Sequence, residues 1–275
     1  MMKNYKFQNK ITQLKHLIRK FLKKDTFYFL FIKRIYLLIC KPFLTIVILI
    51  IDLKKKQLIT KPPDNDHSKK KFLLTLNPNS KILDVGCGNN SPLLTKKIVP
   101  NCFYIGIDIQ DYNQETYESI KSADEYHIVK PDEFDKKILD FQSQIDVVIS
   151  SHNLEHCYER RNVLANMIKT LKKGGKIYLE FPTYSSTSFP GYRDGCLNYY
   201  DDKTHMYLPP DFGEVISILN KENCKIIYAN TNYQDVIGWL FGLFNENSSF
   251  KTKEVREGTW SLWGFQTIVW AEKMF

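Results

Sequence analysis

Glycine and aspartate residues with the spacing of a nucleotide-binding turn follow two apolar runs of the chain. The segment Asp84–Gly88 closes the first run, and Asp108 closes the second, 20 residues after Gly88. Glycine lets a backbone turn tightly and approach a ligand, and an acid at this spacing can accept both hydroxyls of a ribose. A dinucleotide fingerprint would need a third glycine where Ser91 stands. We therefore expect a ligand with a ribose but no pyrophosphate, which disfavours an NAD-dependent enzyme.

A second set of polar residues has the chemistry for moving protons. Histidines and carboxylates can take the proton of a weakly acidic hydroxyl. We prefer His205 as this base, with Asp201 or Asp202 orienting it or binding a divalent ion with it. Two acids and one histidine in a loop are a weak metal signal, so no metal is predicted, and helix capping by the acids is the structural alternative. The other candidates are His152, Glu155 and His156, of which His156 has a purely structural alternative at the start of a helix.

Alternating strands and helices must position these residues. Lys172–Gly175 is expected to close the first helix, and the alternation predicts an α/β fold with a doubly wound, mostly parallel sheet. Ligands of such sheets bind beyond the carboxyl ends of the strands, where both sets of residues lie. Strands are expected at 81–85, 103–107, 126–129, 145–150, 176–181, 224–228 and 265–271, and helices most clearly at 160–171 and 211–220.

The positive charge of the chain is concentrated before residue 72. Residues 1–71 have a net charge of +14, which leaves −5 for residues 72–275 out of the total of +9. We predict a helical extension over 1–59, a linker over 60–71 and the main domain over 72–275. An even basic coat, as on a general nucleic-acid coat protein, is excluded, and no nucleic-acid partner is expected.

The extension combines basic and apolar residues. Residues 7–24 have the spacing of a basic amphipathic helix, and residues 27–51 are apolar but interrupted by Lys33, Arg34 and Lys41. A bilayer span needs about 20 apolar residues, so a single span is less favoured than helices lying in the interface. We predict peripheral contact with an anionic membrane through residues 1–56, on the cytoplasmic face. Packing of the extension on the main domain is the alternative.

Two further features concern the main domain and the thiols. Residues 231–264 form an aromatic-rich insertion before the last strand, with core packing or a second lipid or sugar contact as its roles. The six cysteines form no C-x-x-C pair and no zinc-finger spacing, which predicts free thiols in a reducing compartment. The sequence leaves the oligomeric state open.

The order of four segments gives a resemblance to a known family. ILDVGCGNNS, the strand-end Asp108, IDVVISSHNLEH and LKKGGKIYLEFP resemble the successive motifs of class I S-adenosylmethionine-dependent methyltransferases over about residues 81–182. The final strand would be the antiparallel seventh strand of that fold. The block from IDVVIS to LEFP is also similar to methyltransferases encoded with bacterial surface-glycan assembly enzymes.

The resemblance implies S-adenosylmethionine as the cofactor and assigns residues to it. Asp84 and the two glycines would line its methionine end, Asp108 would hold the ribose, and Ile109 would pack on adenine. Asp132 would meet the adenine amine, and the residues after the fourth strand would face the sulfonium. The full set expected to contact the cofactor is Asp84, Gly86, Cys87, Gly88, Asp108, Ile109, Asp132, Ser151, His152 and Asn153.

The expected function is methylation of a sugar hydroxyl in a surface glycan or its lipid-linked precursor. A nucleic-acid methyltransferase is disfavoured, because no Asn-Pro-Pro-Tyr or Asp-Pro-Pro-Tyr motif follows the fourth strand. A small-molecule or lipid methyltransferase, and a membrane-associated scaffold that kept the fold without catalysis, remain as alternatives.

Overall fold

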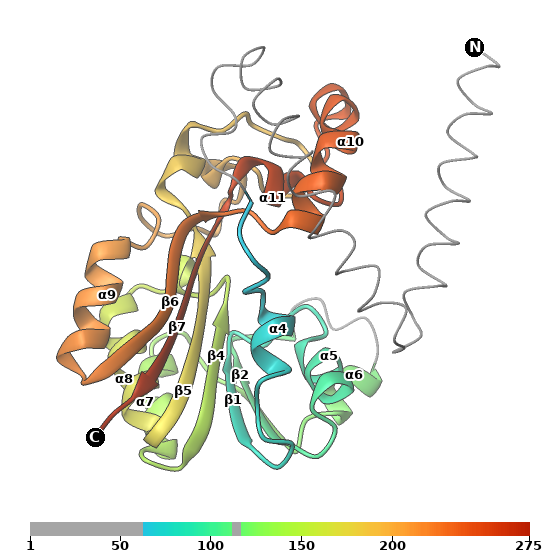
Figure 1. Cartoon of the computed structure of the whole chain (residues 1–275). Coiled ribbons are helices and arrows are strands. Elements are labelled where there is room, and N and C mark those ends of the chain that lie inside the picture. Colours follow the sequence, from blue (N-terminus) through green and yellow to red (C-terminus); the bar gives the residue numbers. More distant parts are fainter. Residues whose placement is uncertain (1–62, 112–116) are drawn as a thin grey trace. The chain divides into compact units, whose positions relative to one another are not determined.

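A seven-stranded sheet forms the centre of the protein (Figure 1), with strand order β3-β2-β1-β4-β5-β7-β6. The computed structural model describes residues 63–111 and 117–275, so the predicted extension 1–59 lies outside the described residues. Only β7 runs antiparallel to its neighbours, which confirms the predicted doubly wound α/β sheet. The strands are β1 (Lys81–Val85), β2 (Phe103–Asp108), β3 (Glu125–Ile128), β4 (Ile145–Ser151), β5 (Leu171–Pro182), β6 (Cys224–Tyr233) and β7 (Gln266–Lys273).

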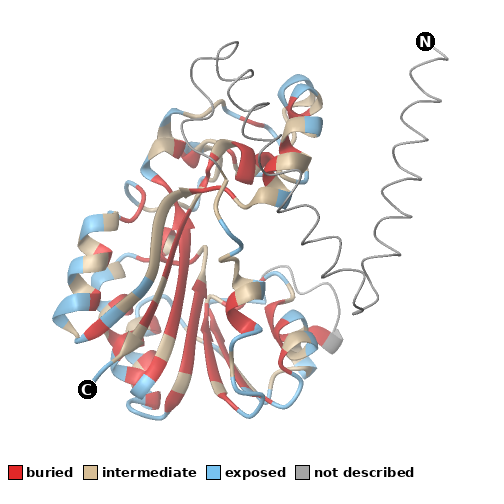
Figure 2. Cartoon of the chain, viewed as in Figure 1, coloured by how far each residue is buried: buried red, intermediate tan, exposed pale blue. Residues whose placement is uncertain are grey.

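Helices cover both faces of the sheet. Figure 1 shows α4, α5 and α6 on one face and α7, α8 and α9 on the other, and one apolar cluster lies on each side of the buried strands. Figure 2 shows the central strands as the most continuously buried part of the chain. The helices are α4 (Lys69–Leu73), α5 (Ser91–Ile98), α6 (Tyr117–Lys121), α7 (Phe134–Ile138), α8 (Arg160–Thr170), α9 (Phe212–Lys221), α10 (Val236–Thr252) and α11 (Thr259–Trp263).

The start of β5 differs from the prediction. Lys172–Gly175 does not close a helix: α8 ends at Thr170, and the next residue already pairs with Ile145 of β4. The register then shifts, and Gly174 takes a φ of 76°. Gly174 serves this irregularity, where three extra residues of β5 are accommodated with a left-handed backbone.

The domain begins earlier than predicted. Residues 63–71, expected to be linker, belong to the compact unit Pro63–Phe275. The ring of His67 stacks on Tyr228 with centroids 3.6 Å apart, and Ser68 caps α4. The linker prediction rests on composition alone, which does not reveal that His67 and Ser68 make these contacts.

The predicted insertion forms two helices after β6, which continues to Tyr233. Trp239 is fully buried, whereas Ile237, Phe244 and Phe250 are exposed on α10. Core packing thus accounts for Trp239, and the second lipid or sugar contact stays a prediction for the exposed residues of α10. Within residues 63–111 and 117–275, no helix is both long and apolar enough to cross a bilayer.

The crossing of α10 and α11 gives a test of packing. Gly258 has a φ of 86°, and a Cβ there would overlap the carbonyl oxygen of Gly238 and the amide nitrogen of Gly242. Gly174 has a φ of 76° with nothing within 4 Å of the added Cβ. We expect Gly174→Ala to lower the free energy of unfolding by about 1–2 kcal/mol and Gly258→Ala by at least about 3 kcal/mol, because overpacking adds to the strain. Urea unfolding of the two variants would measure the difference, and equal costs would contradict this account.

Candidate functional site

The carboxyl ends of β1 and β4 meet where the strand order reverses, the usual ligand position in such sheets. Gly86 follows β1 with a φ of 80°, and its amide donates to the carbonyl of Ile107 at 2.9 Å. A Cβ at Gly86 would lie 2.6 Å from the Cβ of Asn153. The glycine is therefore needed for its conformation and for the close approach of Asn153, which lies just after β4.

Asp108, at the end of β2, is held by backbone amides. Its side chain accepts from the amide of Ile109 at 2.7 Å and also from the amides of Gln110 and Gly88. Burial raises the pKa of this carboxyl and outweighs the amides, which lower it. Ile109 beside it is 47% exposed. The turn after β1 and the acid after β2 thus come together as predicted, with an apolar side chain open beside them.

Asp84 is fully buried in a polar cluster that sequence reasoning missed. Its Oδ2 accepts from Ser91 Oγ at 2.5 Å, Tyr104 Oη at 2.9 Å and Lys69 Nζ at 3.2 Å. Among the described residues its Oδ1 has no hydrogen-bond partner. A buried carboxylate oxygen without a partner is costly, so Oδ1 is suited to a donor of the ligand. Lys69 was not identified because it stands in the lysine run assigned to the linker.

Three other expected contacts are placed differently. The thiol of Cys87 is fully buried against Gly106, and burial raises its pKa. Ser151 donates its hydroxyl to Glu180 Oε2 at 2.8 Å. Each side chain thus has a contact inside the fold, and a contact of Cys87 or Ser151 with the cofactor stays a prediction. Asp132 is exposed in the turn before α7.

His152 lies between two carboxylates, Glu155 and Glu180. Its Nδ1 is 3.1 Å from Glu155 Oε1, and its Nε2 is 3.5 Å from Glu180 Oε1. Burial lowers the pKa of His152, but its hydrogen bonds to these acids and their charges raise it to about 10. The two acids favour the protonated form of the imidazole, which does not accept a further proton, so a catalytic role of His152 stays a prediction.

Glu180 is a second residue that sequence reasoning missed. Although burial opposes ionisation, hydrogen bonds from His152, Ser151 and Tyr178 lower the pKa of Glu180 to about 2. Gln266 of β7 also donates to it. The sequence did contain a signal for Glu180, because it is an acid in the apolar predicted strand 176–181. A buried charge there requires partners.

His205 and His156 lie side by side, with ring centroids 4.9 Å apart. His205 Nδ1 is 2.6 Å from the carbonyl oxygen of Tyr199, and the His205 ring stacks on the Tyr199 ring at 4.2 Å. Burial lowers the pKa of His205. A carbonyl only accepts, so Nδ1 carries the proton and Nε2 keeps its lone pair. His205 thus has the protonation state that a base needs.

Of the two acids near His205, Asp201 stabilises the loop, whereas Asp202 both binds the loop and lies near the imidazole. Asp201 Oδ2 accepts from the amides of Tyr192 at 2.8 Å and Asn198 at 3.0 Å, so our expectation that Asp201 orients His205 is wrong. Asp202 Oδ1 binds Thr204, and its Oδ2 is 3.9 Å from His205 Nε2. The carbonyl of Tyr199, which no pattern of side chains could indicate, orients the ring.

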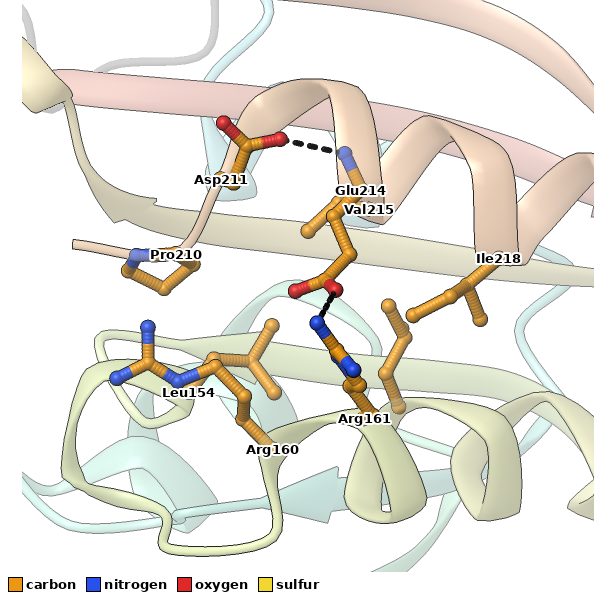
Figure 3. A pocket seen from close by; sticks show the side chains of 9 residues that line it. Leu154, Arg160, Arg161, Pro210, Asp211, Glu214, Val215 and Ile218 are labelled. Atoms are coloured by element: carbon orange, nitrogen blue, oxygen red, sulfur yellow. Dashed lines mark hydrogen bonds and ion pairs between the residues drawn. The ribbon is translucent and has the colours of Figure 1, made fainter. Parts of the chain in front are cut away.

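A small, mostly apolar pocket lies between α8 and α9, behind the short helix of residues 154–156 (Figure 3). An ion pair of Arg161 with Glu214 crosses it, and Asp211 caps α9 beside it. Its lining contains none of the residues predicted to bind the cofactor or to act in catalysis, so it is separate from the site at the strand ends.

The strand-end residues fit S-adenosylmethionine. Asp108 would hold the ribose hydroxyls, the glycine turn would lie against the ligand, and the free Oδ1 of Asp84 would meet a donor at the methionine end. Asn153 packs on Gly86 and lies beside these residues. We call Asp84, Gly86, Asp108 and Asn153 together the cofactor edge.

Comparisons with known proteins agree with this fit. The profile of a family described as a methyltransferase domain matches residues 61–236, more than half of the chain. No curated protein matches.

Solved structures share the fold. An S-adenosylmethionine-dependent methyltransferase from Mesorhizobium loti is 13% identical with a TM-score of 0.51, covering 74% of this chain and 95% of that one. A putative one from Listeria monocytogenes is 14% identical with a TM-score of 0.51, covering 75% and 96%. Phosphoethanolamine N-methyltransferase 2 of Haemonchus contortus, in complex with S-adenosyl-L-methionine, is 15% identical with a TM-score of 0.50, and the match covers 74% of this chain and 51% of that one. The chain belongs to the methyltransferase-domain family, as a class I methyltransferase with S-adenosylmethionine as its cofactor.

Proposed function

We propose that this methyltransferase modifies a hydroxyl group of a sugar in a surface glycan or in its lipid-linked precursor. The observation that carries the proposal is the neutral His205 beside the cofactor edge. The amide of Met206 donates to the carbonyl of Glu155 at 2.9 Å, which joins the loop of His205 to the chain just after β4. This contact supports the proposal, because it brings the loop of His205 close to the carboxyl end of β4.

A hydroxyl acceptor explains why a neutral histidine is useful. S-adenosylmethionine supplies the activated methyl group when it is bound. A sugar hydroxyl keeps its proton at neutral pH, so the chain must provide an acceptor for it. The lone pair on His205 Nε2 is suited to this role, whereas the acids around His152 raise its pKa and favour its protonated form.

Exposed tyrosines around the two histidines favour a sugar. Tyr158 follows His156 closely and is 68% exposed, and Tyr207 follows His205 and is 61% exposed. The two tyrosine rings meet edge to face at 6.0 Å. Aromatic rings with a polar tip suit the apolar faces and hydroxyls of a sugar.

A labelled methyl donor would test the acceptor class. The full chain would be incubated with S-adenosylmethionine carrying a radioactive methyl group and with separate lipid-linked glycans, free oligosaccharides, lipids and RNA. We expect label in the glycan fractions. Label in RNA or in glycan-free lipid would contradict the proposal. Calorimetry without detectable S-adenosylmethionine binding would instead favour a scaffold.

We further propose that the protein works at the cytoplasmic surface of an anionic membrane. The basic and apolar residues 1–56 would supply the contact. The exposed Ile237 and Phe244, which lie on the same side of α10, would add a second apolar contact. Sedimentation with anionic vesicles should retain the protein at high salt, whereas neutral vesicles should bind it less. Complete release at modest salt would contradict apolar insertion.

A further inference from the structure

Three potential metal ligands gather beside the cofactor edge. Glu155, His156 and His205 each offer one ligand atom, and these atoms lie within 4.8 Å of one another. Two of the residues follow β4, and the third comes from the loop after β5, about 50 positions later in the chain. A bound ion at about 2.0–2.2 Å from each ligand would draw the atoms together by small side-chain rotations.

Hydrogen bonds set both imidazoles in the form that binds metals. His205 Nδ1 donates to the carbonyl of Tyr199. His156 Nδ1 lies 3.0 Å from Thr204 Oγ1, whose own hydrogen goes to Asp202 Oδ1 at 2.6 Å. Thr204 Oγ1 must therefore accept from His156. Both histidines keep the Nε2 lone pair, and a ligating histidine typically donates its other N–H in this way.

The carboxylate of Glu155 supplies the independent observation that points to a ligand. The Glu155 side chain is fully buried, with Oε1 next to His152 Nδ1 at 3.1 Å. Among the described residues, Oε2 has no hydrogen-bond partner. A buried carboxylate oxygen left in this state is costly unless it meets a cation or a donor.

The geometry points to a divalent transition-metal site formed by Glu155 Oε2, His156 Nε2 and His205 Nε2. Two imidazoles with one carboxylate favour zinc, cobalt, iron or manganese over magnesium or calcium, which prefer oxygen ligands. Three protein ligands leave a coordination position for an outside molecule. The predicted metal partner Asp201 is not part of this set, because Asp201 holds backbone amides. Asp202 lies outside the three-residue set, although its Oδ2 is 3.9 Å from His205 Nε2.

The metal site would add a way to activate the acceptor hydroxyl. This role rests on the proposed function, whereas metal binding itself does not. An ion held by these three residues would bind the acceptor hydroxyl at its open coordination position and lower the pKa of that hydroxyl. In the loaded site His205 would be a ligand, so the hydroxyl proton would pass to solvent water while the oxygen attacks the methyl group. In an ion-free site His205 takes the proton itself.

Cobalt titration tests the site without any acceptor. The full chain would be stripped with a chelator, dialysed and titrated with Co²⁺, with calorimetry and visible absorption as readouts and Mg²⁺ as a control ion. We expect one Co²⁺ per chain in the wild type. Affinity should fall by at least about tenfold in Glu155→Gln and in the double variant His156→Gln with His205→Gln. His127→Gln is the matched control, because His127 pairs with Glu125 outside the site.

A second readout uses only the wild-type chain. Bound Co²⁺ should protect His156 and His205 from diethyl pyrocarbonate, with modified residues located by mass spectrometry. Absence of stoichiometric binding, equal affinity in the double variant, or modification unaffected by Co²⁺ would overturn the site. S-adenosylmethionine binding, measured separately by calorimetry, tests the cofactor function, so failure of one is distinguishable from failure of the other.

Discussion

Replacing Asp108 by alanine is expected to weaken S-adenosylmethionine binding by at least about 100-fold. Three backbone amides fix the Asp108 carboxylate at the end of β2, where it would accept both ribose hydroxyls. Hydrogen bonds to a charged group contribute about 1.5–3 kcal/mol each, and about 1.4 kcal/mol corresponds to a factor of ten. Isothermal titration calorimetry would measure the loss.

The matched control for this prediction is Asp140→Ala. Asp140 is exposed and pairs with Lys137 at 2.9 Å on the protein surface, so its loss should leave cofactor affinity unchanged. Equal affinities for the wild type and Asp108→Ala would remove Asp108 from the site.

The ionised carboxylate of Asp108 should lower the free energy of unfolding. Burial raises the pKa of Asp108 above its ordinary 3.8, so ionisation is less favourable in the folded than in the unfolded state. The loss in free energy of unfolding is absent below pH 3.8. It grows as the pH rises to the pKa of Asp108 in the folded state, and it is constant above that pKa. Asp108→Asn should therefore be more stable than the wild type near pH 7, with an advantage that shrinks in acid. Urea unfolding across this range would measure it.

The sequence predicted the sheet and the cofactor edge because both depend on local patterns. Short β-branched runs identified the strands, and the turn glycine Gly86 and the strand-end Asp108 follow directly from them. The final antiparallel strand followed from the family resemblance. These features need no knowledge of distant contacts.

The details of the site could not be predicted because they depend on residues far apart in the chain. The raised pKa of His152 depends partly on Glu180, which lies on the neighbouring strand β5. His205 owes its tautomer to a backbone carbonyl. The acids beside His205 looked like its partners in sequence, but Asp201 stabilises a turn. Buried charge pairs and hydrogen bonds to backbone carbonyls produce no periodic pattern of residue types in the sequence.

Substituting His205 with alanine is expected to lower kcat for methyl transfer by about 10²–10⁴-fold, the usual contribution of a positioned acid–base group. The loss is expected whether Nε2 takes the proton or binds an ion that acidifies the hydroxyl. Affinity for S-adenosylmethionine should be retained, because the cofactor contacts come from β1, β2 and β4. Initial rates at saturating cofactor, together with calorimetry, would separate the two effects.

A histidine elsewhere in the fold provides the control for this substitution. His127 packs beside Phe141 with centroids 5.7 Å apart and pairs with Glu125 at 3.1 Å, so His127→Ala should retain kcat. Unchanged kcat in His205→Ala on the natural acceptor would exclude His205 from catalysis. A fall in kcat that is accompanied by equal loss of cofactor binding would instead indicate a structural role. Only a fall in kcat with intact cofactor affinity agrees with a neutral imidazole, held by the carbonyl of Tyr199, that acts on the acceptor.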